Sequence, residues 1–77
     1  MNIIYSSDNY YVVEYPGRLG YELVDKRAAR GTFFQGDVAE KFVESMRNAV
    51  AEDASVEHVD EFLDSFDVLL TQPLVMH

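Results

Sequence analysis

The sequence predicts an α+β fold, in which a four-stranded antiparallel β-meander is followed by two α-helices packed on one face of the sheet. The first half of the chain holds four short runs of β-branched and aromatic residues, separated by Asp, Asn, Pro and Gly. After Gly36 the apolar residues recur at spacings of three and four, as in an amphipathic helix. With 77 residues the chain has room for one hydrophobic core, so we expect residues 1–77 to form a single domain.

The four runs that predict strands are joined by residues that favour tight turns. Residues 6–9 read Ser-Ser-Asp-Asn, and Pro16-Gly17 marks the second reversal. The third connection, residues 27–31, is short and basic, and we expect it to project into solvent. Strands joined by such short connections are antiparallel neighbours. The expected strands cover residues 2–6, 10–15, 20–26 and 31–35.

Two helices are expected in the second half. The first begins at Asp37, an N-cap residue followed by Glu40 in a capping-box arrangement, and ends near Ala51. The second begins after the N-cap Ser55 and runs to about Leu70. The apolar residues that share one side of the first helix are Val38, Phe42, Met46, Ala49 and Val50. Those that share one side of the second are Val56, Val59, Phe62, Leu63, Phe66, Leu69 and Leu70.

Charge is distributed unevenly along the chain. The net charge is −8, and seven acids but no Lys or Arg follow Arg47. Binding to nucleic acid requires a basic surface that displaces counterions from phosphates, so we expect no nucleic-acid ligand. A basic partner fits better, either another protein or the Arg27 and Arg30 hairpin of a second copy. The acids of this candidate partner face, which we expect to be solvent-exposed, are Glu57, Asp60, Glu61, Asp64 and Asp67.

Composition also limits the compartment and the ways in which the fold is stabilised. The chain contains no Cys, which excludes disulfides and thiolate metal sites. Its first residues lack the basic start and the long apolar core of a signal peptide. No apolar run approaches the roughly 20 residues that a membrane span requires. We therefore expect a cytoplasmic protein that contacts no membrane.

Two clusters of residues were weighed as sites for chemistry. His58 lies three residues from Glu61, but a single helix face supplies too few converging ligands for a metal. Residues 6–8 resemble a nucleophile with a helper, and only His58 and His77 are present to complete a triad. Turn formation explains residues 6–8 without catalysis. We therefore expect no catalytic residue, no metal and no cofactor.

The predicted strands carry apolar side chains on both faces of the sheet. Two helices of about four turns cover only one of these faces. The other face would expose an apolar patch, which predicts a homodimer. Two alternatives stay open, in which the tail from Leu74 to Met76 covers this face or the extra aromatic residues pack at an edge. The residues expected in the dimer interface are Tyr5, Tyr10, Tyr11, Val12, Val13, Tyr15, Phe33 and Phe34.

The order of motifs along the chain resembles a family of short betaproteobacterial proteins of unknown function. This resemblance implies an α+β domain and implies no activity, cofactor or site. The motifs that carry it are Met1-Asn2-Ile3-Ile4-Tyr5, Val13-Glu14-Tyr15-Pro16, the segments 20–26 and 30–39, Val59-Asp60-Glu61-Phe62-Leu63, and a final His77.

A second and less extensive similarity is to the antitoxin half of HicAB toxin–antitoxin pairs. It rests on a Gly-Tyr strand, a second strand and then residues 36–40, which open an amphipathic helix. That resemblance implies a small partner-binding domain that occludes a ribonuclease toxin. The chain lacks the Pro-Asp-Leu-Pro-Gly-Cys-like stretch between the strands and a second helix of DNA-binding character.

These observations favour a non-catalytic protein–protein interaction module that self-associates. The alternative is a small-molecule binder or small enzyme with a Tyr-lined pocket between the sheet and the helices. The sequence leaves open which sheet face the helices cover and whether residues 73–77 add a strand.

Overall fold

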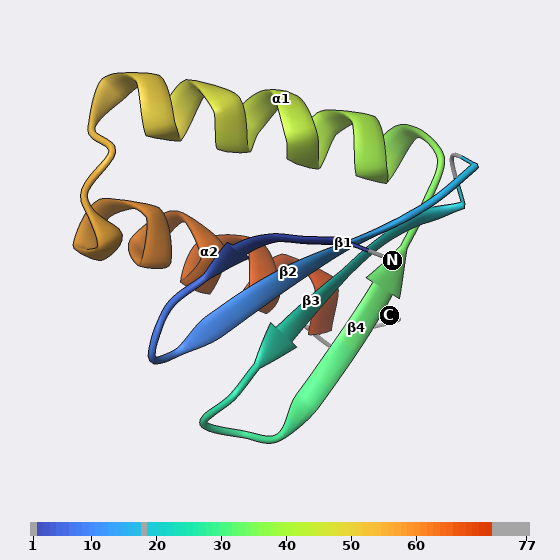
Figure 1. Cartoon of the computed structure of the whole chain (residues 1–77), viewed down its shortest axis with the longest axis horizontal. Coiled ribbons are helices and arrows are strands. Elements are labelled where there is room, and N and C mark those ends of the chain that lie inside the picture. Colours follow the sequence, from blue (N-terminus) through green and yellow to red (C-terminus); the bar gives the residue numbers. More distant parts are fainter. Residues whose placement is uncertain (1, 18, 72–77) are drawn as a thin grey trace, which may run out of the picture.

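The structure is a computed structural model, and it describes residues 2–17 and 19–71. It confirms the predicted α+β fold of four antiparallel strands followed by two helices (Figure 1). Each predicted strand lies within one residue of an observed one. The elements in chain order are β1 (Asn2–Ser6), β2 (Tyr10–Tyr15), β3 (Gly20–Asp25), β4 (Arg30–Phe34), α1 (Asp37–Glu52) and α2 (Val56–Thr71).

The sheet is a meander in which each strand pairs with its neighbour in sequence, in the order β1-β2-β3-β4. The pairing of β1 with β2 shifts between Ile3 and Tyr5, where a β-bulge interrupts the register. The β1–β2 turn is closed by Ser7, whose backbone N–H donates to Tyr10 O at 2.8 Å. At the β2–β3 turn Gly17 has φ 70°, a conformation that glycine adopts without steric cost. Short turns therefore fix the whole sheet.

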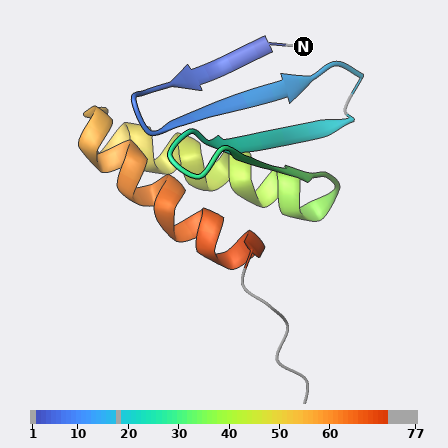
Figure 2. The ribbon, with the colours of Figure 1, turned by 90° about the horizontal axis from the view of Figure 1, so that it is seen from below.

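The two helices run antiparallel to each other on one side of the sheet (Figures 1 and 2). The N-cap of α1 is Gly36, with φ 69° and no side-chain capping bond, so the prediction of Asp37 as N-cap is wrong by one residue. Gly36 adopts the positive φ that the sharp exit from β4 requires. The predicted N-cap of α2 is confirmed, because Ser55 Oγ accepts a hydrogen bond from the His58 N–H at 3.3 Å.

The hydrophobic core lies between the sheet and the two helices. Four strand residues and four helix residues form it, namely Tyr10, Val12, Leu23, Phe34, Ala39, Phe42, Val59 and Leu63. An aromatic cluster centres on Phe42, whose ring centroid lies 4.9 Å from that of Phe34 and 4.8 Å from that of Phe66. One core therefore holds the sheet against α1, the sheet against α2 and the two helices against each other.

The predicted apolar sides of the helices are only partly correct. Val38 and Val50 of α1 and Val56 and Leu69 of α2 are exposed, although each was placed on a buried stripe. These residues lie near the ends of their helices, whereas the central turns cover the sheet. The apolar side of each helix is therefore longer than the part of the sheet that it contacts. Ala39 is buried at the start of α1 in place of Val38. The question of a strand at residues 73–77 lies outside the described residues.

Candidate functional site

The acidic side of α2 is largely engaged with the sheet of the same chain. Glu57, Glu61 and Asp64 are exposed, as expected. The expectation is wrong for Asp60 and Asp67, which are only 9% and 6% exposed. Helical spacing placed both on the outer side, but the hairpin turns of the sheet extend alongside α2 and cover them. Buried carboxylates require hydrogen-bond partners, and the two turns supply them.

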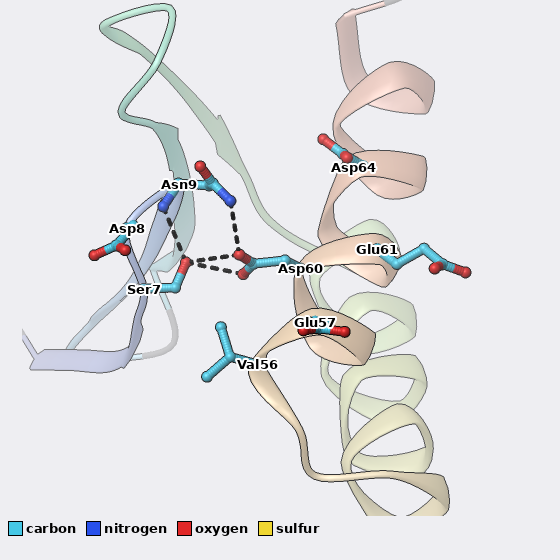
Figure 3. Close-up of a pocket in the computed structure, with 8 residues that line it drawn as sticks. All are labelled: Ser7, Asp8, Asn9, Val56, Glu57, Asp60, Glu61 and Asp64. Atoms are coloured by element: carbon cyan, nitrogen blue, oxygen red, sulfur yellow. Dashed lines mark hydrogen bonds between the residues drawn. The ribbon is translucent and has the colours of Figure 1, made fainter.

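Asp60 is held by the β1–β2 hairpin (Figure 3). Ser7 Oγ donates to both of its carboxylate oxygens, at 2.9 and 3.1 Å, and Asn9 Nδ2 donates to Oδ2 at 3.1 Å. Tyr5 OH donates to Oδ1 at 2.9 Å, and burial together with this bond raises the pKa of Tyr5. Glu61 points away from this cluster in Figure 3. Asp60 is therefore a structural link between α2 and the first hairpin.

Asp64 joins α2 to the β3–β4 turn. Arg27 Nη2 lies 2.8 Å from Asp64 Oδ1 and 2.7 Å from Tyr10 OH, and Tyr10 OH donates to the same carboxylate oxygen. The bonds from Tyr10 and Arg27 lower the pKa of Asp64. Burial and the bond to Asp64 raise the pKa of Tyr10. Asp25 Oδ1 accepts from the N–H groups of Arg27 and Ala28 and so fixes the turn that presents Arg27.

A second ion pair of the same kind joins Arg30 Nη2 to Asp67 Oδ2 at 3.0 Å. The basic hairpin is exposed at every residue from 26 to 31, as expected, and in addition both of its arginines pair with α2 of their own chain. Arg27 and Arg30 lie three apart, as do Asp64 and Asp67, but Glu57 with Asp60 and Glu61 with Asp64 have the same spacing. The sequence spacing therefore does not identify these pairs.

The residues weighed for catalysis or metal binding do not converge. His58 Nε2 lies 3.3 Å from Glu52 Oε1, and Ser7 Oγ is bound to Asp60. His77 lies outside the described residues. Within residues 2–17 and 19–71, no group of three His, Asp or Glu side chains is arranged to hold a metal ion. None of the helices described in the structure is long and apolar enough to cross a membrane.

The sheet face opposite the helices is uncovered by any described residue (Figure 2). Ile3 is 61% exposed and Phe33 is 51% exposed. The ring of Phe33 packs edge-on against Tyr15 at 5.6 Å, and Tyr15 OH donates to Glu22 Oε1 at 2.8 Å. Lys26 Nζ lies 5.6 Å from the centroid of the Tyr11 ring at the β3–β4 end. We call this surface the free sheet face, and strand pairing places on it Ile3, Tyr11, Val13, Tyr15, Glu22, Val24 and Phe33.

Three of the eight residues expected in a dimer interface lie inside the core, and a fourth packs against it. Tyr10, Val12 and Phe34 are buried against the helices, and Tyr5 packs against the same core. Tyr10, Val12 and Phe34 have almost no exposed surface with which to contact a partner. Val13 points to the free sheet face but is buried by its neighbours there. Three predicted interface residues, Tyr11, Tyr15 and Phe33, lie accessible on that face, and the sequence analysis missed Ile3 and Val24 beside them.

A groove runs between α1 and the sheet. It consists of two adjoining hollows of about 790 and 360 Å³, which share Glu14, Tyr21, Val43 and Arg47 as walls. The larger hollow extends to the β2–β3 turn and to Glu40 and Glu44, and the smaller one extends to Ile4, Met46 and Val50. Tyr21 OH donates to Glu14 Oε2 at 3.2 Å, and burial together with this bond raises the pKa of Tyr21. We call this feature the α1 groove.

Together the meander, the paired helices and the uncovered sheet face define a small two-layer α+β protein. The chain belongs to the family described as "Protein of unknown function (DUF3567)", whose model matches residues 1–77. This confirms the predicted membership of a family of unknown function.

Among curated proteins, one from Burkholderia thailandensis that carries only a locus name is 44% identical over 85 aligned residues, with 100% of both chains covered. No solved structure matches the chain. Neither the family nor this relative is described as an antitoxin, so the similarity to HicAB pairs stays a prediction.

Proposed function

We propose that the protein is a non-catalytic interaction module of the cytoplasm that self-associates through the free sheet face. One observation carries the proposal. Ile3 and Phe33 are more than half exposed beside Tyr11, Tyr15 and Val24, on a face that no described residue covers. Contiguous exposed apolar side chains of this kind mark interaction surfaces, and tyrosine is enriched in them.

A second copy fits this face because the face carries both signs of charge. Glu22 lies beside Val13 and Phe33 on the neighbouring strands, while Lys26 lies at the β3–β4 end. In a two-fold contact each patch meets its own copy, so charges of opposite sign at different positions can pair across the axis. This complementarity favours self-association over an unrelated partner.

The size of the face sets the expected strength. Four strands at a spacing of ~4.8 Å, each of about six residues at ~3.3 Å, give a face of roughly 19 by 20 Å. Stable interfaces bury about 800 Å² on each partner, and weaker ones bury less. A face of about 380 Å² lies below the size of a stable interface and within the size of weak ones. We therefore expect a dimer that dissociates on dilution.

Light scattering during size exclusion tests the proposal. We expect a mass near twice the 8.8 kDa of one chain at high micromolar concentration, falling towards 8.8 kDa on dilution. Ile3→Lys, which places a charge in the contact, should give a monomer. The matched control Leu69→Lys changes a 70% exposed residue of α2 in the same way and should leave the dimer intact. A mass of one chain that does not change with concentration would refute self-association.

A further inference from the structure

The α1 groove is open along its length and has two different walls. Its floor is apolar, formed by Ala39, Phe42, Val43 and Met46, with the exposed Ile4 at one end. Its rim is polar, and carries three glutamates, one arginine and the hydroxyl group of Tyr21. The stretch of α1 from residue 39 to residue 50 spans ~16 Å at 1.5 Å per residue. That length matches about five residues of extended chain at ~3.3 Å each.

The charges of the rim are not balanced within the described chain. Glu14, Glu40 and Glu44 line the groove against Arg47 alone, and none of these four residues forms an ion pair with another described residue. On α2 the situation is the reverse, because Asp64 and Asp67 are each paired with an arginine. Glu57 and Glu61 remain exposed on α2, but the exposed acids of α1 differ from them in bordering the apolar floor of the α1 groove.

We propose that the α1 groove binds an extended segment of a partner protein that carries lysine or arginine side chains alternating with apolar ones. Apolar side chains on one side of the segment fit the floor, and the long side chains of lysine or arginine on the other side reach the carboxylates of the rim. The ring of Tyr21 adds an aromatic surface on which a cation is stabilised. The open shape suits a chain that passes through, and the alternating pattern matches the one-sided apolar floor.

Glu14 is a less suitable residue for testing this proposal than the other two acids. It accepts the hydrogen bond of Tyr21 OH, so replacing it disturbs the sheet as well as the rim. Glu40 and Glu44 lie one turn apart on α1 and are exposed. Their replacement by glutamine removes two charges from the groove and no contact from the core.

The probe is a five-residue peptide with blocked ends in which leucine and lysine alternate, and binding is followed by titration with backbone amide NMR. We expect the largest shift changes at Tyr21, Val43 and Arg47. The double variant Glu40→Gln with Glu44→Gln should bind about three- to tenfold more weakly, as for two partly exposed charge pairs. Arg47→Gln should bind more tightly, because it removes the opposing charge. The matched control Glu57→Gln with Glu61→Gln removes two exposed charges from α2 and should leave affinity within about twofold.

Several results would overturn the proposal. Equal weakening by both double variants would show attraction to net charge without a site. Weaker binding by Arg47→Gln would contradict the charge argument, and shift changes confined to the free sheet face would place the peptide elsewhere. Absence of measurable binding would also refute it. The titration is repeated with Ile3→Lys, so that a failure of self-association and a failure of peptide binding are distinguished.

Discussion

The two helices carry similar numbers of acids but use them differently. On α2, Asp60 is bound by side chains of the β1–β2 hairpin, and Asp64 and Asp67 are bound by arginines at the β3–β4 hairpin. On α1, Glu40 and Glu44 have no ion pair among the described residues, and the helix is held by apolar contacts around Phe42. The comparison teaches that net charge gives no measure of free acidic surface. A run of acids is available to a partner only where its own fold has not already used it.

The largest expected effect concerns the apolar attachment of α1. Phe42→Ala removes a fully buried ring that contacts Phe34, Phe62 and Phe66, and should cost about 3–5 kcal/mol of folding free energy. Such a loss is a large part of the total stability of a small domain. Urea unfolding followed by circular dichroism measures it. If the parent stability were retained, the core centred on Phe42 would be wrong.

The next effect tests the polar attachment of α2. Asp60→Asn keeps the shape of the side chain but replaces one acceptor oxygen with a donor, facing hydroxyl and amide donors from Tyr5, Ser7 and Asn9. Leaving a buried group without its partner costs about 1–3 kcal/mol. The same unfolding experiment applies. Glu61→Gln, a change of the same kind at the exposed neighbour, serves as the control and should have little effect.

A smaller effect on stability is expected when the pH is lowered and Asp64 becomes protonated. Hydrogen bonds from Tyr10 and Arg27 hold the pKa of Asp64 below its ordinary value. A carboxyl group whose pKa is lowered by folding stabilises the protein above its unfolded pKa of about 4, and this contribution is lost as the pH falls through the folded value. Melting temperature should therefore fall more steeply below pH ~4 in the parent than in Asp64→Asn. Parallel curves for the two proteins would contradict this assignment.

The smallest expected effect on stability concerns the exposed acids of α1. The double variant Glu40→Gln with Glu44→Gln should change folding stability by no more than about 0.5 kcal/mol, because both side chains are exposed and unpaired among the described residues. Differential scanning calorimetry of parent and variant measures it. A clear destabilisation would mean that these acids already serve the fold, as those of α2 do.

The strands and helices could be predicted closely because their signals are local. Residues 6–9 and Pro16-Gly17 mark turns, and Ser55 marks a helix start, from residue types alone. The faces of the sheet could not be predicted. In β2, residues 10–13 are apolar or aromatic at every position, so a period of two does not distinguish the side that meets the helices.

The burial of the acids on α2 and their contacts with the sheet could not be predicted from the sequence either. Helical periodicity assigns a residue to a side of its own helix. It contains no information on how far a turn of the sheet extends alongside that helix. Asp60 meets Tyr5 across 55 positions of sequence, and Asp67 meets Arg30 across 37. Such contacts are decided by the tertiary arrangement, which local sequence patterns do not contain.

The links from α2 to two of the three hairpins of the sheet also bear on the order in which the chain folds. Each hairpin joins neighbouring segments and closes a short loop, so its contacts have a low cost in chain entropy. The links through Asp60, Asp64 and Asp67 join the last helix to the first half of the chain, so they form only after almost the whole polypeptide is present. We expect the meander to assemble first and α2 to dock last, with its carboxylates fastening two hairpins that have already formed.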